Sequence, residues 1–203
     1  MWETFWKDYF IDSKISNYKD YTKKKYWDLC DELIDAYKIQ EWDRILDFGC
    51  ACGNLVREFV DRRYDNIIWT DISKRAISYW INQWLWKYLQ EYTDSILTHN
   101  YNFIFMLDVL EHIPLEWEIQ KLLTSIKEEV EVIIRVPVSN EENWRYVLDV
   151  SENDKTHVQR HTKERWIKLF KMSWFTHIWY ITLNNIYDSN GVLAVLIIKE
   201  WQK

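Results

Sequence analysis

From Arg44 onward, short apolar runs alternate with amphipathic stretches, and this alternation constrains the fold more than any other feature. Such alternation is typical of βαβ units and a parallel sheet. The expected strands are RILDF, NIIWT, YLQEY, NFIFML, VEVIIRV, HIWYITL and VLAVLIIK. Helices are expected over residues 54–62, 74–86, 116–128 and 162–172. The pattern predicts a doubly wound α/β fold, in which helices cover both faces of a mainly parallel seven-stranded sheet.

The chain has 203 residues, of which 48% are hydrophobic, and this size suits one domain with a sizeable core. We expect a single domain over residues 1–203, with an N-terminal helical lid segment over 1–40 and the core over 41–203. The lid segment carries an aromatic stripe at helical spacing, made of Trp2, Trp6, Tyr9 and Phe10. Such a stripe could roof a binding site, although plain helix packing is the commoner role. The last two strands should form an antiparallel hairpin across the turn-rich stretch NNIYDSNG.

Composition and charge exclude several classes of protein. The apolar runs fall far short of the ~20 residues that a membrane-spanning helix needs, and the start MWETFWKDYF lacks the features of a signal peptide. Cys30, Cys50 and Cys52 have no spacing typical of a zinc ribbon or disulfide framework, so we expect reduced thiols and a cytoplasmic location. A net charge of −6 and a pI near 5.4 make nucleic acid an unlikely partner.

The stretch ILDFGCACGNLVREF reads as a buried strand, a turn of small residues and the start of an amphipathic helix. Small residues at Gly49, Ala51 and Gly53 allow backbone N–H groups at the helix start to approach a ligand. Asp71 ends the second expected strand, where a carboxylate can accept hydrogen bonds from two ribose hydroxyls. The simpler alternative is a tight βα turn and a helix-capping aspartate.

Four stretches resemble, in order and spacing, the motifs of class I S-adenosylmethionine-dependent methyltransferases. They are ILDFGCACG, WTDISKRAI, YNFIFMLDVLEHIP and HTKERWIKLFKMSWF, and the resemblance runs from about Trp42 to Phe175. It implies a Rossmann-like fold, S-adenosylmethionine as cofactor, and transfer of its methyl group to a small-molecule acceptor. The family pattern has glycine where this chain has Ala51, a change that the turn should tolerate.

The resemblance also implies which residues contact the cofactor. The methionine part would be held by Asp47 and by the turn residues Gly49, Cys50, Ala51 and Gly53. The adenosine part would be held by Asp71 at the ribose, Ile72 against adenine, and Asp94 with Ser95 at the adenine amino group. Asp108 and Val109, after the fourth family strand, would close over the cofactor.

Two other functions share parts of this pattern. A nicotinamide-dependent oxidoreductase would carry G-x-G-x-x-G, but Asn54 stands where the third glycine is required. Radical use of S-adenosylmethionine would need a cysteine triplet for an iron–sulfur cluster, which this sequence lacks. A non-catalytic domain that keeps the fold but has lost cofactor binding is the remaining alternative.

The segment DVLEHIP lacks the Pro-Pro-aromatic run of many amide and adenine N-methyltransferases, so O-methylation is favoured. Some O-methyltransferases with a similar acidic string hold a divalent metal there. This makes Asp108, Glu111 and His112 the alternative metal ligands, with His157 or His161 as an optional further ligand. Since the same string is common in relatives without a metal, we assign none. His112 and His157 are the candidate catalytic bases, and His161 is a further candidate, because imidazole titrates near neutral pH.

The chain contains only 3 glycines but 14 tryptophans, whereas average glycine usage of ~7% would give about 14 glycines. Trp42, Trp69 and Trp174 stand where the family pattern expects glycine. Our hypothesis is that the gene decodes UGA as glycine and that the printed chain reads those codons as tryptophan. An indole at position 69 should then crowd the turn at Gly49. Trp166 fits its helical pattern and should be a true tryptophan.

Overall fold

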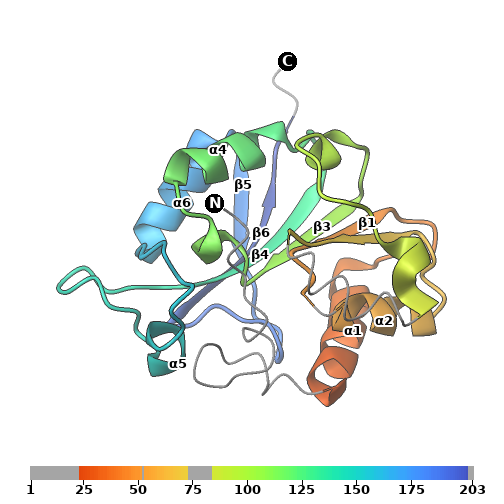
Figure 1. Cartoon of the computed structure of the whole chain (residues 1–203), viewed down its shortest axis with the longest axis horizontal. Coiled ribbons are helices and arrows are strands. Elements are labelled where there is room, and N and C mark those ends of the chain that lie inside the picture. The colour runs from red at the N-terminus through yellow and green to blue at the C-terminus, as the bar shows by residue number, and fades with distance from the viewer. Residues whose placement is uncertain (1–22, 52, 73–83, 201–203) are drawn as a thin grey trace.

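The computed structural model describes residues 23–51, 53–72 and 84–200 (Figure 1). One six-stranded sheet organises them, in the order β2-β1-β3-β4-β6-β5. Its strands are β1 (Ile45–Phe48), β2 (Ile67–Thr70), β3 (Phe103–Leu107), β4 (Glu131–Pro137), β5 (His177–Tyr180) and β6 (Val192–Ile198). The first four strands in the sheet order are parallel, and β6 is antiparallel to β4 and β5. The mainly parallel α/β fold and the C-terminal hairpin are therefore confirmed.

The expected strand YLQEY is wrong. Residues Trp84–Tyr88 form the 3-10 helix η2, and Leu89 makes one isolated parallel bridge with Trp69. Gln90 N donates to Trp69 O at 3.0 Å, after which the chain turns away. The segment lies beside β2, where a further parallel strand would add to the sheet, but only one residue aligns. The described residues therefore form six strands rather than seven.

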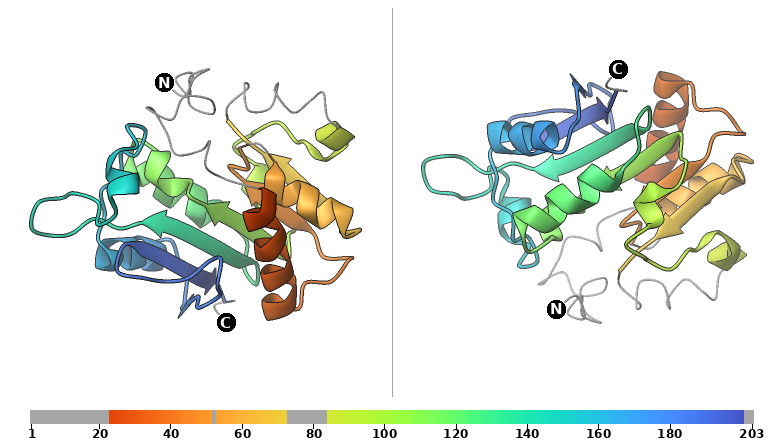
Figure 2. Two further views of the ribbon diagram at one scale, coloured as in Figure 1. Left: turned by 90° about the horizontal axis from the view of Figure 1, so that it is seen from below. Right: turned by 90° about the horizontal axis from the view of Figure 1, so that it is seen from above.

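Helices cover both faces of the sheet (Figure 2). On one face lie α1 (Lys23–Tyr37) and α2 (Asn54–Asp61), and on the other lie α4 (Glu116–Ser125) and α6 (Lys163–Met172). The short elements η3 (Ile96–Thr98), η4 (Leu110–His112) and α5 (Asp149–Glu152) belong to the connections. The expected helices at 54–62, 116–128 and 162–172 are confirmed to within a few residues. Most of 74–86, and the aromatic stripe at Trp2 to Phe10, lie outside the described residues.

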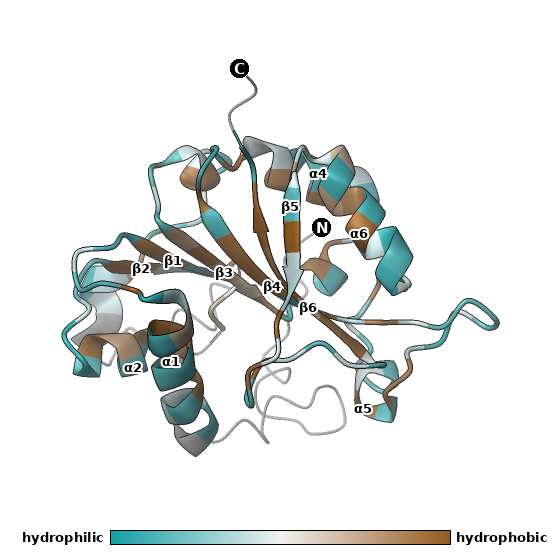
Figure 3. Cartoon of the chain, turned by 180° about the vertical axis from the view of Figure 1, so that it is seen from behind, coloured by the Kyte–Doolittle hydropathy of each residue, from teal (hydrophilic) through white to brown (hydrophobic). Residues whose placement is uncertain are grey.

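Two apolar cores flank the sheet because successive side chains of a strand point to opposite faces. Ile45 and Phe105 pack towards α1 and α2, whereas Leu46 and Ile104 pack towards α4 and α6. Figure 3 shows the apolar residues gathered along the central strands, with polar residues on the outer sides of the helices. None of the helices within the described ranges is long and apolar enough to cross a membrane.

The tryptophans singled out by the sequence lie in different environments. Trp69 is fully buried in the core beside α1 and α2, while Trp42 is largely exposed. The neighbouring turn keeps its backbone bonds to Thr70 O, at 2.9 Å from Gly49 N and 3.2 Å from Cys50 N. Trp166 is buried, and its indole N–H donates to Pro137 O at 3.3 Å, as suits a true tryptophan.

Trp174 occupies a glycine-type position at the end of α6. Its φ is +71°. Trp174 N donates to Lys171 O at 3.1 Å and Phe175 N donates to Phe170 O at 3.2 Å, the paired bonds of a Schellman motif. In that motif the residue with positive φ is usually glycine, because a side chain there is strained.

We expect Trp174→Gly to stabilise the protein by about 1 kcal/mol, since left-handed backbone costs an L-residue roughly 1–2 kcal/mol and the exposed indole contributes little packing. Urea unfolding measures the change. Arg63→Gly provides the comparison, because Arg63 lies just after α2 and its C-cap with the same φ of +71°. A Trp174→Gly protein that is less stable than the parent would refute the strain argument.

Candidate active site

The turn after β1 needs glycine at its first position. Gly49 has φ +77°. A Cβ added there would lie 2.5 Å from Val109 Cγ2, a distance that real Cβ atoms do not tolerate. Gly49 therefore lets the turn and the chain after β3 approach each other closely at the carboxyl edge of the sheet. Ala51 also has positive φ, at 48°, and Gly53 begins α2 with φ 62°.

Hydrogen bonds join this turn to the end of β2. Gly49 N and Cys50 N both donate to Thr70 O, at 2.9 and 3.2 Å. Ala51 N donates to Asp71 Oδ2 at 2.8 Å. Asp71 thus contacts the glycine turn through one carboxylate oxygen, and both lie on the same cavity. The sequence predicted that Asp71 and the turn share a site, and the structure brings them together.

Asp47 lies in β1 directly before the turn and is buried at the base of the cavity. Burial, reinforced by the negative charge of Asp71, raises the pKa of Asp47 to about 7. The carboxyl group therefore changes its charge near physiological pH. An ionised Asp47 would attract a cationic ligand group, which suits an ammonium or sulfonium.

The raised pKa of Asp47 predicts a dependence of stability on pH. The folded pKa lies above the unfolded one, so the stability that this group contributes is complete below the unfolded pKa and is lost as the pH rises through about 7. From pH 5 to pH 8 the parent should lose about 2 kcal/mol relative to Asp47→Asn. Urea unfolding of both proteins at the two pH values measures this difference. Equal pH dependence in both proteins would contradict it.

A cavity of about 930 Å³ opens along the carboxyl ends of β1, β2 and β3. It also contacts Lys25, Tyr26 and Leu29 of α1, and residues from the loop between β5 and β6. The predicted site residues that line it are Asp47, Gly49, Cys50, Ala51, Asp71, Ile72, Asp94, Asp108, Val109, Glu111, His112 and His157. Gly53 and Ser95, in contrast, are not among its lining residues.

The predicted adenine contacts lie at the edge of this cavity. The Asp94 side chain is 79% exposed and forms an ion pair with Lys121 Nζ at 3.3 Å. Ser95 directs its hydroxyl towards Thr93 Oγ1, at 3.3 Å, rather than into the cavity. The exposed Asp94 carboxylate is therefore accessible to an adenine, whereas the Ser95 side chain would have to rotate to contact one.

Asp108 is held by a partner, Arg135, that is not among the residues predicted from the sequence. Its backbone has φ 57°, and its carboxylate forms a two-pronged ion pair with the Arg135 guanidinium, in which Arg135 Nε lies 2.9 Å from Asp108 Oδ1. Arg135 projects from β4 and lines the cavity. The signal for this partner in the sequence was Arg135 itself, a charged residue inside the apolar run VEVIIRV. The pair places both charges beside Val109 at the cavity wall.

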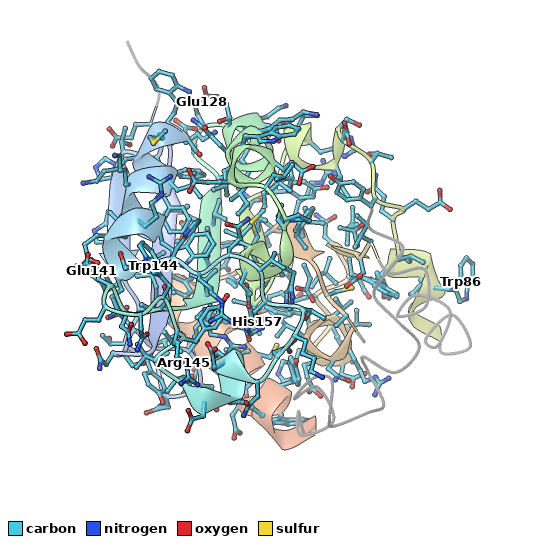
Figure 4. The ribbon with its side chains drawn as sticks, turned by 60° about the vertical axis from the view of Figure 1, so that its left-hand side comes forward. Trp86, Glu128, Glu141, Trp144, Arg145 and His157 are labelled. Carbon is cyan, nitrogen blue, oxygen red and sulfur yellow. The ribbon has the colours of Figure 1, made fainter. Side chains whose placement is uncertain are left out.

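Glu111, His112 and His157 converge on one point of the cavity wall. Glu111 Oε1 lies 4.0 Å from His112 Nε2 and 3.8 Å from His157 Nε2. The two imidazole rings are 4.8 Å apart. Figure 4 shows His157 near the short helix α5, whereas Trp86 projects outwards. The sequence named these three residues, with His157 only as one of two optional partners of the other two.

Burial governs the protonation of this cluster. It raises the pKa of Glu111 well above the usual range, and the nearby Asp108 charge adds to the shift. It lowers the pKa of His112 to about 4, and it lowers that of His157. Both imidazoles are therefore neutral at pH 7 and able to accept a proton. His161 lies apart from the cavity lining, with Nε2 at 3.3 Å from Glu116 Oε2, so it is not placed to act on a bound acceptor.

A sequence profile described as a methyltransferase domain matches residues 18–186. No curated protein matches the chain. Because the profile covers most of the sequence, the chain belongs to the class I S-adenosylmethionine-dependent methyltransferase family, as the sequence motifs indicated.

Solved structures share the fold at low sequence identity. A S-adenosylmethionine-dependent methyltransferase from Clostridium acetobutylicum has a TM-score of 0.62 and 16% identity, over 90% of this chain and 94% of that one. Human N-acetylserotonin methyltransferase, solved with S-adenosylmethionine, has a TM-score of 0.59 and 14% identity, and the match covers 89% of this chain and 57% of that one. A Nostoc punctiforme protein, described as a proposed O-methyltransferase, has a TM-score of 0.58 and 14% identity, and the match covers 85% of this chain and 56% of that one. The chain thus spans little more than half of the last two proteins.

Proposed function

We propose that the protein transfers the methyl group of S-adenosylmethionine to an oxygen atom of a small-molecule acceptor. The observation that carries this proposal is the joining of the glycine turn, Asp47 and Asp71 to the buried histidine cluster in one cavity. Its volume of about 930 Å³ is near the upper end of ligand sites, which span roughly 300–1,000 Å³, and leaves room for an acceptor beside the cofactor.

In this proposal the turn and Asp71 bind the cofactor. Backbone N–H groups near Gly49 approach its methionine part, Asp47 offers a negative charge to its ammonium group, and Asp71 accepts from its ribose hydroxyls. Asp108 and Val109 bound the same space from the end of β3. When bound, the cofactor supplies an electrophilic methyl group on a sulfonium. The residues around it orient the acceptor and exclude bulk water.

The histidine cluster would remove the acceptor's proton. A neutral imidazole of His157 or His112 accepts the hydroxyl proton as the new oxygen–carbon bond forms and the carbon–sulfur bond breaks. The products are a methyl ether, S-adenosylhomocysteine and a protonated imidazole that returns its proton to solvent. The names of the human and Nostoc neighbours are compatible with such chemistry, and the absence of a Pro-Pro-aromatic run after β3 supports oxygen over amide nitrogen.

The proposal extends to the location of the protein in the cell and to its domain organisation. Cys30 and Cys50 are buried thiols, and we propose that the protein resides in the reducing cytoplasm. We also propose one domain over the whole chain, with the segment before residue 40 as a lid. The part of α1 that lines the cavity, at Lys25, Tyr26 and Leu29, supports this role.

The test combines binding with a methyl-transfer screen. Labelled S-adenosylmethionine is incubated with the protein and matched sets of hydroxyl, amine and short RNA acceptors. We expect label on a small hydroxyl compound and a methyl ether by mass spectrometry. Label on amines or RNA alone would overturn the acceptor class. Saturable NAD binding without S-adenosylhomocysteine binding would favour the oxidoreductase, and binding of neither would favour the non-catalytic domain.

A further inference from the structure

We propose that the methyl acceptor is a small hydroxy acid, and that Lys25 and Arg135 bind its carboxylate at the end of the cavity beside β4. The inference rests on the proposed methyl transfer and names the class of acceptor within it. Both side chains line the cavity, and neither is among the site residues predicted from the sequence.

The order of the strands separates two parts of the cavity. The glycine turn and Asp71 follow β1 and β2, whereas Arg135 projects from β4, on the far side of β3. Neighbouring strands lie about 4.8 Å apart, so β4 is roughly 10 Å from β1 and about 14 Å from β2. Pro137 of β4 and Val192 of β6 pair with each other and also line the cavity. A cofactor bound over β1 and β2 therefore leaves the space beside β4 for the acceptor.

Arg135 lies on the face of the sheet that α1 covers. Side chains of a strand alternate between faces, and Ile133, two residues earlier, packs in the core beside α1 and α2. The cross-strand neighbours of Arg135 are Leu107 on β3 and Ala194 on β6. Its side chain is only 13% exposed, so a positive charge lies among apolar neighbours at the cavity wall. A charge in such surroundings interacts strongly with an anionic ligand group.

The ion pair with Asp108 orients the guanidinium. Arg135 Nε and Nη2 donate to the two carboxylate oxygens of Asp108, so the pair engages one edge of the group. A guanidinium has five N–H donors in a planar fork, and the edge formed by Nη1 and Nη2 can bind a second carboxylate in the same plane. The ion pair therefore fixes the plane in which an acceptor carboxylate would bind.

Lys25 brings a second positive charge to the same place. It lies in the first turn of α1. Partial burial lowers the pKa of Lys25, the charge of Arg135 lowers it further, and the charge of Asp108 raises it. Lys25 therefore lies near the ion pair, and two positive groups with one negative group leave one positive charge. A carboxylate would balance this charge, whereas a phosphate monoester would exceed it with about −1.5 to −2 charges.

Glu32 of α1 holds the helix against the loop between β5 and β6. Its Oε2 accepts from Asn185 N at 2.8 Å, and its Oε1 accepts from Asn184 Nδ2 at 2.7 Å. The same loop lines the cavity at Asn184, Asn185 and Tyr187. Helix and loop are thus joined where they border the acceptor space, which keeps Lys25 in position above Arg135.

The candidate base lies near this anion site. Burial lowers the pKa of His157, and the charges of Asp154 and Asp108 raise it. Asp154 Oδ2 lies directly beside the imidazole, at 3.7 Å from Nε2, whereas Asp108 acts from its pair with Arg135. A hydroxy acid held by its carboxylate would present its hydroxyl to the imidazole, because a fixed anchor restricts its orientation. Methyl transfer then forms a methyl ether, releases S-adenosylhomocysteine, leaves the proton on the imidazole and does not change the carboxylate.

The test compares anionic and neutral probes of the same shape. The full chain, with and without saturating S-adenosylhomocysteine, is titrated by calorimetry with meta- and para-hydroxybenzoate, the matching hydroxybenzamides and the matching hydroxyphenyl phosphates. We expect one hydroxybenzoate isomer to bind at least tenfold more tightly than its amide, because hydrogen bonds between two charged groups are strong. It should also bind more tightly than the phosphate.

Variants locate the effect. Lys25→Gln should lower the ratio of benzoate to benzamide affinity at least fivefold. The double variant Arg135→Gln with Asp108→Asn should do the same, and it leaves neither charge of the ion pair buried alone. Lys121→Gln is the matched control, because Lys121 also lines the cavity but pairs with the exposed Asp94, at 3.3 Å. It should keep the ratio of the parent.

The inference would be overturned if the parent bound neither benzoate isomer, if it bound the amides or the phosphates as tightly, or if Lys121→Gln lowered the ratio equally. Should the double variant fail to fold, Lys25→Gln and the parent still decide. S-Adenosylhomocysteine affinity is measured on the same samples. Cofactor binding without preference for the acid refutes this inference alone. Absence of cofactor binding refutes the proposed function, and the titrations without S-adenosylhomocysteine then test the anion site by themselves.

Discussion

Asp71→Ala should weaken the binding of S-adenosylhomocysteine by about 1–3 kcal/mol, or roughly 5- to 150-fold. Two losses contribute to this effect. The ribose hydroxyls lose a charged acceptor, and Ala51 N loses the partner that it has at 2.8 Å. Because Ala51 has positive φ, the turn is less well fixed without that bond. Calorimetry at one pH and one ionic strength measures the change.

Asp71→Asn separates the two contributions. Its amide oxygen can still accept from Ala51 N, so the turn should keep its shape while the charge is removed. We expect an affinity between those of the parent and Asp71→Ala, with an unfolding midpoint near that of the parent. Unchanged affinity in Asp71→Ala would remove Asp71 from the cofactor site.

Lys199→Met should lower the free energy of unfolding by about 2–4 kcal/mol, since hydrogen bonds from charged groups are strong and buried carbonyls left without donors are costly. Lys199 Nζ is buried beyond the end of β6 and donates to the carbonyls of Leu123, Thr124 and Ile126, at 2.8, 2.9 and 2.8 Å. These carbonyls end α4, where a positive charge also complements the helix dipole. Urea unfolding measures the loss.

Lys127→Met provides the comparison for Lys199→Met. Lys127 lies near the same end of α4, but its bond to Asn100 Oδ1 is exposed, so its removal should change stability by less than about 0.5 kcal/mol. Similar losses in both variants would show that the buried capping contacts are not the cause.

The parts of the fold whose structure depends on residues adjacent in the sequence were predictable from the sequence. The run ILDF, the small turn and the amphipathic helix after it carry their signals locally, and β1 and α2 form there. The stretch YLQEY has strand-like residues, yet its structure depends on how it aligns with β2, and only Leu89 bridges to Trp69. Edge pairing of this kind is not encoded in local pattern.

The residues of the candidate site likewise divide into those whose proximity the sequence predicts and those whose proximity it does not predict. The glycine turn and Asp71 follow adjacent strands in one βαβ unit, so their proximity could be inferred. The meeting of Glu111 with His157 depends on a loop that folds back and bonds through Val158 N and Gln159 N, and no spacing in the sequence reports it. The bond between Arg135 and Asp108 likewise depends on the pairing of β3 with β4.

Reading of UGA as glycine stays a proposal. Trp174 and Trp144, with φ of 71° and 58°, occupy backbone regions that favour glycine, although Trp144 is not among the tryptophans that stand at family glycine positions. Lys38, Arg63 and Glu129 also have positive φ, so the strain is not confined to tryptophan. The nucleotide sequence of the gene tests this hypothesis. UGA codons at positions 42, 69 and 174 are expected, and UGG codons there would contradict it.

Titration of the full chain with S-adenosylhomocysteine by calorimetry tests most directly whether the turn at Gly49 and Asp71 form a cofactor site. We predict saturable binding of one ligand per chain at micromolar concentration or below, with loss of affinity in Asp71→Ala and no saturable binding of NAD. No detectable binding to the folded parent protein, or binding that Asp71→Ala leaves unchanged, would contradict the proposed site.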